Sequence, residues 1–180
     1  MTFDYPGYPI RFIQCEPCKD GSAHQFSLIF KFFSPVTCYH YIVRAEYHTN
    51  HFFAIKFYCK KDRKSDFKYS KIVNRGDLGN ILATSASVIP SLLVQFPKVS
   101  FVFAAARSVG RKNKPLEGYS LTQRFRLYAY LMPLRFGSET FEHISYPNIS
   151  CYMLYHKNAP KQRLEIEDIL AETYDGLLNV

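Results

Sequence analysis

A run of apolar residues in the middle of the chain, Val99–Ala106, restricts the possible folds more than any other segment. A uniformly apolar strand is typical of the centre of a sheet, where both faces of the strand are buried. The preceding segment, Leu78–Phe96, has helical periodicity instead. Its apolar positions are Leu82, Ala86, Ile89, Leu93 and Phe96. Pro90 lies inside this segment and predicts a kinked or split helix, because proline has no backbone N–H.

Segments on the N-terminal side of this helix have the alternation or the aromatic content of strands. The predicted strands are Pro9–Gln14, His24–Ser34, Tyr39–Tyr47, Phe52–Lys60 and Phe67–Val73. The four residues His48–His51 are predicted to form a hairpin turn. An aromatic content of 17% without any Trp also favours strands over helices.

A second helix is predicted after the apolar run. Ser120 or Thr122 is placed to cap it, and it should continue to about Arg135, with Pro133 ending or bending it early. The last predicted elements are two strands and an amphipathic helix, at Phe141–Ile144, Asn148–His156 and Lys161–Leu178. This order of elements predicts an α/β or α+β fold in which helices cover a mixed, mainly antiparallel sheet.

The charge of the chain is unevenly distributed. The net charge is +8, and residues 161–180 hold two basic and five acidic side chains, a balance of 2 − 5 = −3, so residues 1–160 carry +8 + 3 = +11. We expect one domain over residues 1–160, with the acidic helix of residues 161–180 packed on it or on a second copy in a homo-oligomer. A basic domain attracts nucleic acid, phosphate or an acidic protein partner, although the charge alone also fits a surface without a ligand.

Several classes of protein are not indicated. The start of the chain lacks a secretory signal, and no apolar stretch approaches the roughly 20 residues needed to span a bilayer. Five irregularly spaced cysteines do not form a disulfide framework, and Cys15-x-x-Cys18 is half of a zinc motif without its second half. Nucleotide-binding and serine-hydrolase motifs are also missing. We therefore expect a cytoplasmic protein that binds neither a membrane nor a metal.

Two pairs of residues flank the apolar run. Gly76 suits a backbone angle that other residues resist, and Asp77 is predicted to cap the first helix with its carboxylate. Arg124 and Tyr128 share one face of the second helix, whereas Arg126 points elsewhere. A cation at a helix start needs a partner, so we expect an Asp77–Arg124 ion pair, with Gly76, Asp77 and Arg126 in structural roles. The functional alternative is anion binding by Arg124 with Tyr128 as a donor.

A basic loop follows the apolar run. Ligands of open α/β sheets bind beyond the carboxyl ends of strands, which is where this loop begins. Tyr119, near its end, offers a ring on which a base can stack. The residues predicted to bind a ligand or nucleic acid are Arg107, Arg111, Lys112, Lys114 and Arg124. The alternatives are a mobile tip or a surface for docking a protein.

The order of elements resembles that of the GCN5-related N-acetyltransferases (GNAT). In that family, a loop with the pattern Gln/Arg-x-x-Gly-x-Gly/Ala wraps the pyrophosphate of coenzyme A, and a Tyr in a later Leu-Tyr helix protonates the departing thiolate. Leu127-Tyr128 matches the second feature. At Arg75–Asn80 the glycines have a different spacing, and Asp77 places a carboxylate where phosphates would bind.

A second resemblance covers about residues 50–156. It rests on Asn74 with Gly76-Asp77, Leu82-Ala83-Thr84, Phe103–Ala106 and Arg124-Phe-Arg126-Leu-Tyr128. These motifs are similar to those of a family of small bacterial proteins of unknown function. The resemblance implies a GNAT-like fold and an intracellular setting, and it implies no activity.

These observations lead to two main functional predictions. The favoured one is a non-catalytic binding module without a cofactor, which contacts nucleic acid or a protein partner in a bacterial assembly. The alternative is a divergent acyltransferase that uses acetyl-coenzyme A, with Tyr128 as its general acid. A cleft between the strands ending at Val73 and Ala106 would favour the enzyme. A closed pair of strands, with Asp77 bonded to Arg124, would favour the binding module.

Overall fold

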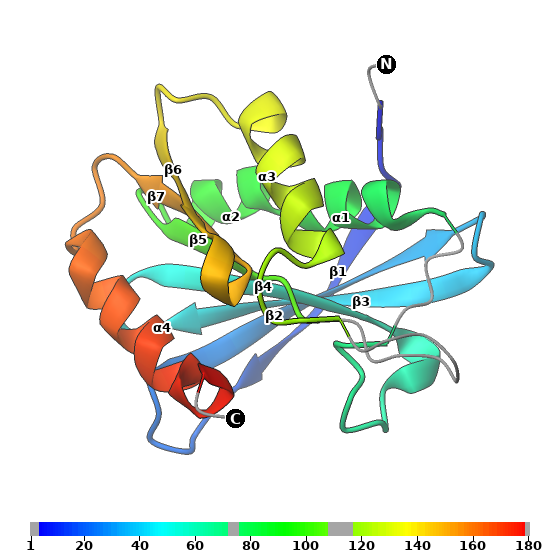
Figure 1. Cartoon of the computed structure of the whole chain (residues 1–180), viewed down its shortest axis with the longest axis horizontal. Helices are drawn as coiled ribbons and strands as arrows, with labels where there is room; N and C mark the ends of the chain where they lie inside the picture. Colours follow the sequence, from blue (N-terminus) through cyan, green and yellow to red (C-terminus); the bar gives the residue numbers. More distant parts are fainter. Residues whose placement is uncertain (1–3, 72–75, 108–116, 179–180) are drawn as a thin grey trace.

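The computed structural model describes residues 4–71, 76–107 and 117–178, and only the backbone of residues 173–178. Within these residues, seven strands form one mixed sheet in the order β1-β2-β3-β4-β5-β7-β6 (Figure 1). The strands are β1 (Ile10–Pro17), β2 (His24–Ser34), β3 (Tyr39–His48), β4 (Phe52–Cys59), β5 (Ser100–Ala104), β6 (Phe141–Tyr146) and β7 (Cys151–His156). The helices are α1 (Leu78–Ala86), α2 (Ile89–Gln95), α3 (Gln123–Arg135) and α4 (Arg163–Leu178), with short 3-10 helices at Lys60–Asp62 and Pro147–Ile149. The predicted mixed α/β fold is confirmed.

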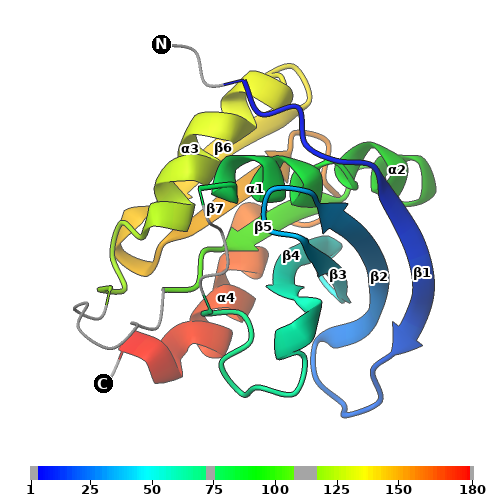
Figure 2. The same ribbon diagram turned by 90° about the vertical axis from the view of Figure 1, so that its right-hand side faces the viewer.

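Helices cover both faces of the sheet (Figure 2). Helices α1, α2 and α3 pack on one face, where Leu82 and Ile89 are buried against sheet residues such as Phe101. Helix α4 lies on the other face, where Ile166 and Leu170 join a second, smaller apolar cluster with residues of β4, β5 and β7. This burial of apolar surface on both sides explains why the central strand is apolar after Ser100.

Strand β5 is the buried central strand that the apolar run predicts. Its first four residues are fully covered, and it lies between β4 and β7. It pairs antiparallel with β7 and parallel with β4. The parallel pairing is short, because it joins only Phe52–Ala54 of β4 to Ser100–Val102 of β5. Beyond these residues the two strands are not paired with each other.

Local sequence signals explain how the elements begin and end. The first helix is split as predicted, since α1 ends at Ala86 and Pro90 lies in the first turn of α2. Thr122 caps α3, because its hydroxyl oxygen accepts a hydrogen bond from the Phe125 N–H at 3.2 Å. Helix α3 continues past Pro133 to Arg135. The hairpin turn at His48–His51 is also present, closed by a bond from the His51 N–H to the His48 carbonyl.

The predicted strand Phe67–Val73 is wrong over its described part. Residues 66–70 form turns, and residues 72–73 lie outside the described residues. The alternating aromatic and basic side chains contact each other instead of forming a strand. The Lys68 ammonium nitrogen lies over the rings of Tyr58 and Tyr69, 5.0 and 5.3 Å from their centroids. Stacking of cations on rings thus replaces strand pairing in this segment.

Among the described residues, one apolar stretch, Leu78–Gln95, has the length and composition of a membrane span. It corresponds to α1 and α2 together, and 61% of it is buried inside the fold. Buried core helices also meet these criteria of length and composition. The expected cytoplasmic location without membrane binding stays a prediction.

Candidate ligand-binding cleft

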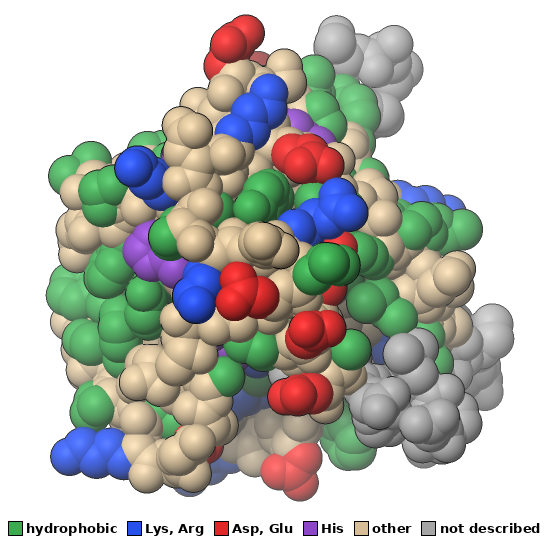
Figure 3. All heavy atoms as spheres, turned by 90° about the vertical axis from the view of Figure 1, so that its left-hand side faces the viewer, with side chains coloured by type: hydrophobic (Ala, Val, Ile, Leu, Met, Phe, Trp, Pro, Cys, Tyr) green, Lys and Arg blue, Asp and Glu red, His purple; other side chains and the backbone are tan. Residues whose placement is uncertain are grey.

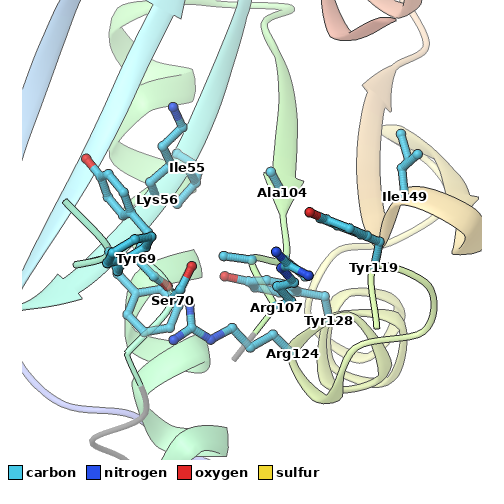
Figure 4. Close-up of a pocket in the computed structure, with 14 residues that line it drawn as sticks. Ile55, Lys56, Tyr69, Ser70, Ala104, Arg107, Tyr119, Arg124, Tyr128 and Ile149 are labelled. Carbon is cyan, nitrogen blue, oxygen red and sulfur yellow. Dashed lines mark hydrogen bonds between the residues drawn. The ribbon is translucent and has the colours of Figure 1, made fainter. Parts of the chain in front are cut away.

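A cavity of about 370 Å³ opens where β4 and β5 diverge (Figure 4). One wall consists of Ile55, Lys56 and Phe57 of β4 with Phe67, Tyr69 and Ser70. The opposite wall consists of Ala104, Ala105, Ala106 and Arg107, with Tyr119 and Ile149. Arg124 and Tyr128 of α3 complete the lining. We call this cavity the β4–β5 cleft, and its volume is that of a site for a small molecule, which is typically about 300–1,000 Å³.

The backbone of β4 borders the cleft with one edge. Strand β4 stays paired with β3 as far as Cys59, whereas its pairing with β5 ends at Ala54. From Ile55 onward, one edge of β4 therefore has no strand partner among the described residues. An unpaired edge offers N–H and C=O groups to an extended ligand, as when a peptide adds to a sheet.

Tyr128 lies between the two walls of the cleft (Figure 4). Its ring is 2% exposed and packs against Phe103, with 4.8 Å between the ring centroids. Among the described residues, its hydroxyl has no hydrogen-bond partner. Burial raises the pKa of Tyr128 well above its usual value, and the nearby charge of Arg124 opposes this rise. The hydroxyl is therefore protonated at neutral pH and can donate a hydrogen bond into the cleft.

Arg124 is already bonded within the protein. Its guanidinium donates hydrogen bonds to the backbone carbonyls of Tyr69 and Lys71, the latter at 3.1 Å. It also lies over the ring of Phe57, 4.8 Å from the centroid. Burial lowers its pKa, yet the two carbonyls stabilise the charged form. The predicted ligand-binding cation thus holds one wall of the cleft in place.

Asp77 has different partners from the predicted ones. Its buried carboxylate accepts hydrogen bonds from the Tyr8 hydroxyl at 2.8 Å, the Ser34 hydroxyl at 2.6 Å and the Asn80 amide at 3.0 Å. It makes no capping bond to the α1 backbone and no ion pair with Arg124. Both expectations are wrong, because neutral donors already fill the acceptor sites of the carboxylate. Gly76 has the predicted positive φ, at 84°.

The donor Tyr8 belongs to an N-terminal segment that sequence analysis missed. This segment runs along α1 before β1 begins (Figure 2). The Gly7 N–H donates to the Asn80 side chain at 3.2 Å, and the Tyr8 N–H donates to the Thr84 hydroxyl at 2.8 Å. The approach is close, since a Cβ on Gly79 would lie 2.2 Å from the ring of Tyr5. The small and polar residues along α1 were the signal in the sequence that could have indicated another segment packed closely against this helix.

The basic loop is described in part. Arg111, Lys112 and Lys114 lie outside the described residues. Arg107 lines the cleft, with its guanidinium carbon 4.0 Å from the centroid of the Tyr119 ring. One face of the Tyr119 ring, which was expected to stack on a base, is thus covered by an arginine. Arg126 is exposed, and its side chain makes no hydrogen bond or ion pair with another described residue, so no side-chain contact supports its predicted structural role.

The acidic side chains gather on the face that carries α4 (Figure 3). Arg163 pairs there with Glu142 and Glu167, both at 3.2 Å. In contrast, the described residues that line the cleft include three cations and no carboxylate. The charge separation expected from the sequence thus coincides with a separation between the α4 face and the cleft.

No family model, no curated protein and no solved structure matches the chain. Both resemblances drawn from the motifs therefore stay predictions. Within the described residues, no three His, Cys, Asp or Glu side chains are placed to hold a metal ion.

Proposed function

We propose that the chain is an N-acyltransferase of GNAT-like architecture and that the β4–β5 cleft binds an acyl thioester. The observation that carries this proposal is the opening of the parallel β4–β5 pair after Ala54, with Tyr128 in the cavity it creates. The order of elements supports it. An antiparallel meander, a helix, a central strand, a helix with Leu127-Tyr128 and a closing hairpin follow each other as in the GNAT arrangement.

The residues of the cleft fit the acyl and thiol-bearing part of coenzyme A. Alanines and aromatic rings make the walls apolar, and the free edge of β4 offers partners for the amides of an extended arm. The carboxylate of Asp77 leaves the first N–H groups of α1 uncapped, so it does not compete with an anion for them. The remaining part of the predicted phosphate loop, residues 72–75, lies outside the described residues.

Tyr128 supplies the acid for this reaction. When bound, coenzyme A supplies the acyl group as a thioester, whose sulfur leaves as the acyl group passes to an amine. The raised pKa of Tyr128 keeps its proton on the phenolic oxygen at neutral pH, so the hydroxyl can donate this proton to the departing sulfur. The Arg124 charge lowers the cost of the phenolate that results, because it stabilises the negative form. The proton that the amine loses on forming the amide then restores the phenol, so that the products are the amide and the free thiol. The contact with Phe103, at 4.8 Å between the ring centroids, holds the Tyr128 ring in place.

A thermal melt in the presence of acetyl-coenzyme A tests this function. A ligand that binds the native state stabilises it by about 2.7 kcal/mol at a hundred times its Kd, so the melting temperature should rise and saturate. In assays that follow thiol release, Tyr128→Phe should keep the melting shift but lose about 10²- to 10⁴-fold in turnover.

Tyr130→Phe is the matched control, since Tyr130 lies two residues further along α3 and is 38% exposed. It should keep both binding and turnover. The proposal would be abandoned if millimolar acetyl-coenzyme A left the melting temperature of the wild-type chain unchanged.

A second candidate function is the non-catalytic binding module. Its support is the segment 60–68, where the cations Lys60, Lys61, Arg63 and Lys64 are exposed beside Phe67, which is 63% exposed. Cations interleaved with aromatic rings suit contact with a single-stranded nucleic acid. A mobility-shift titration should then show affinity that falls steeply with salt. Absence of binding at low salt would remove this candidate.

A further inference from the structure

Among the described residues, three cations line the β4–β5 cleft, and two of them already have polar partners. Lys56 forms an ion pair with Glu46, with 2.6 Å between the ammonium nitrogen and the carboxylate oxygen. Arg124 donates to two backbone carbonyls. Arg107 differs from both, because it makes no hydrogen bond or ion pair with any other described residue.

The position of Arg107 is nevertheless fixed. Its guanidinium lies 4.0 Å from the centroid of the Tyr119 ring, and Figure 4 shows the two side chains together on one wall of the cleft. Stacking on a ring orients the plane of the guanidinium while leaving the N–H groups at its edge unused. A half-buried fork of donors held in this way is suited to bind a planar carboxylate or a phosphate with two hydrogen bonds.

We infer that the ligand of the cleft carries a carboxylate or phosphate group that pairs with Arg107. The inference rests on the proposed function in taking the β4–β5 cleft as the binding site. The anionic group belongs either to the acceptor amine or to coenzyme A. In both cases the ligand is apolar where it meets Ile55, Phe57 and the alanines after β5, and anionic where it meets Arg107. The described residues that line the cleft include no carboxylate that could pair with this cation beside the apolar walls.

Binding measurements on Arg107→Gln test the inference. The probes are acetyl-coenzyme A, acetyl-pantetheine without phosphates, and the N-acetyl derivatives of leucine and phenylalanine, each as free acid and as carboxamide. Charge-assisted hydrogen bonds are worth enough that their loss should weaken binding of the recognised anion about 10- to 100-fold. Arg126→Gln is the control, since Arg126 is an exposed arginine of α3 outside the cleft lining and should not change any affinity.

The pattern of losses identifies the anion. If Arg107→Gln weakens the free acids but not the carboxamides, Arg107 binds the carboxylate of the acceptor. If it weakens acetyl-coenzyme A but not acetyl-pantetheine, Arg107 binds a phosphate. The inference is overturned if Arg107→Gln matches Arg126→Gln within twofold for every probe, or if the wild-type chain binds none of the anionic probes at 10 mM or below (roughly the weakest binding of interest).

The two proposals can fail separately. Transfer of the acetyl group to amines with equal efficiency in Arg107→Gln would retain the acyltransferase and overturn the anion site. Binding of the free acids that depends on Arg107, without any effect of acetyl-coenzyme A, would retain the anion site and remove the acyltransferase.

Discussion

Asp77 and Arg124 are two buried ions of opposite charge, and the fold solvates them in different ways. Asp77 is 3% exposed and accepts hydrogen bonds from three neutral side chains. Arg124 is 7% exposed and donates to two backbone carbonyls. Neither forms a direct ion pair with a described residue, although the negative charge of Glu117 opposes the lowering of the Arg124 pKa. The comparison indicates that hydrogen-bond partners can hold a buried charge without a direct ion pair.

The hydrogen-bond partners of Asp77 and those of Arg124 also depend on the sequence to different degrees. The donors to Asp77 come from the N-terminal segment, β2 and α1, through Tyr8, Ser34 and Asn80. Each of these requires a particular side chain. The acceptors for Arg124 are main-chain groups of residues 69 and 71, which any residue type could supply. The Asp77 site therefore ties distant segments together, whereas the Arg124 site positions a single wall of the cleft.

The largest effect is expected from Asp77→Ala. The substitution leaves three donors without an acceptor, and it should lower the free energy of unfolding by about 3–4 kcal/mol. Urea denaturation monitored by circular dichroism measures the loss. Asp66→Ala, at an exposed aspartate, should change stability by less than about 0.5 kcal/mol. A loss below about 1 kcal/mol in Asp77→Ala would show that water replaces the carboxylate easily, contrary to its burial.

A smaller loss, about 2 kcal/mol, is expected from Arg124→Met. Two carbonyls lose their donor, but removal of a buried cation also removes its desolvation cost. Amide hydrogen exchange should become faster around Tyr69–Lys71, because this wall loses its anchor to α3. Arg126→Met is the matched control and should leave exchange unchanged. Unchanged protection in Arg124→Met would mean that other contacts hold the wall.

His48 provides a pH-dependent test of the same comparison. Both ring nitrogens are buried without a hydrogen-bond partner in the described part of the chain, and the ring stacks on Phe52 at 4.6 Å. Burial, together with the charge of nearby His24, lowers the pKa of His48 to about 4, while Glu46 opposes and Lys56 adds to this shift. Unlike Asp77 and Arg124, the His48 ring has no hydrogen-bond partner among the described residues, and it stays neutral.

The sign of the pH effect follows from that lowered pKa. The unfolded chain takes up a proton at His48 near its ordinary value of about 6.5, and the native chain does so only near pH 4. Stability should therefore fall as the pH decreases from about 6.5 to about 4. His48→Phe keeps the stack on Phe52 and should show a weaker fall over this window. Parallel pH profiles of the two chains would contradict the assignment.

The smallest effect is the coupling between the two ions. Asp77 and Arg124 share no hydrogen-bond partner, so Asp77→Asn and Arg124→Gln should be additive within about 0.5 kcal/mol. A double-mutant cycle of unfolding free energies measures this. Coupling above about 1 kcal/mol would restore the ion pair expected from the sequence.

Local signals predicted much of the fold. The apolar run around Phe101 identified the central strand, and Pro90 identified the break between α1 and α2. Of the two predicted caps of α3, Ser120 and Thr122, the structure has Thr122. Each of these depends on one residue type or on a pattern within a few positions. Arg124 and Tyr128 were predicted to share one face of the second helix, and both of them line the β4–β5 cleft.

The polar contacts of Asp77 and Arg124 could not be predicted from local sequence patterns. Tyr8 and Ser34 are 69 and 43 residues away from Asp77 in the sequence. The partners of Arg124 are main-chain carbonyls, which leave no trace in the residue types. The prediction of a strand after β4, at Phe67–Val73, was wrong for a related reason. The alternation of aromatic and basic residues in this segment has the period of a strand, but Lys68 uses the rings of Tyr58 and Tyr69 for stacking.

The short parallel pairing between β4 and β5, which we call the seam, has a consequence for the order in which the chain folds. Strands β1–β4 are joined by turns and need only contacts that are local in the sequence, whereas the seam joins Phe52–Ala54 to residues about fifty positions later. Closing such a long loop for three residue pairs is slow, because its entropy is lost before the contacts form. We expect pulse-labelled hydrogen exchange to show protection of β2 and β3 before β5. Simultaneous protection of all three strands would contradict a late-closing seam.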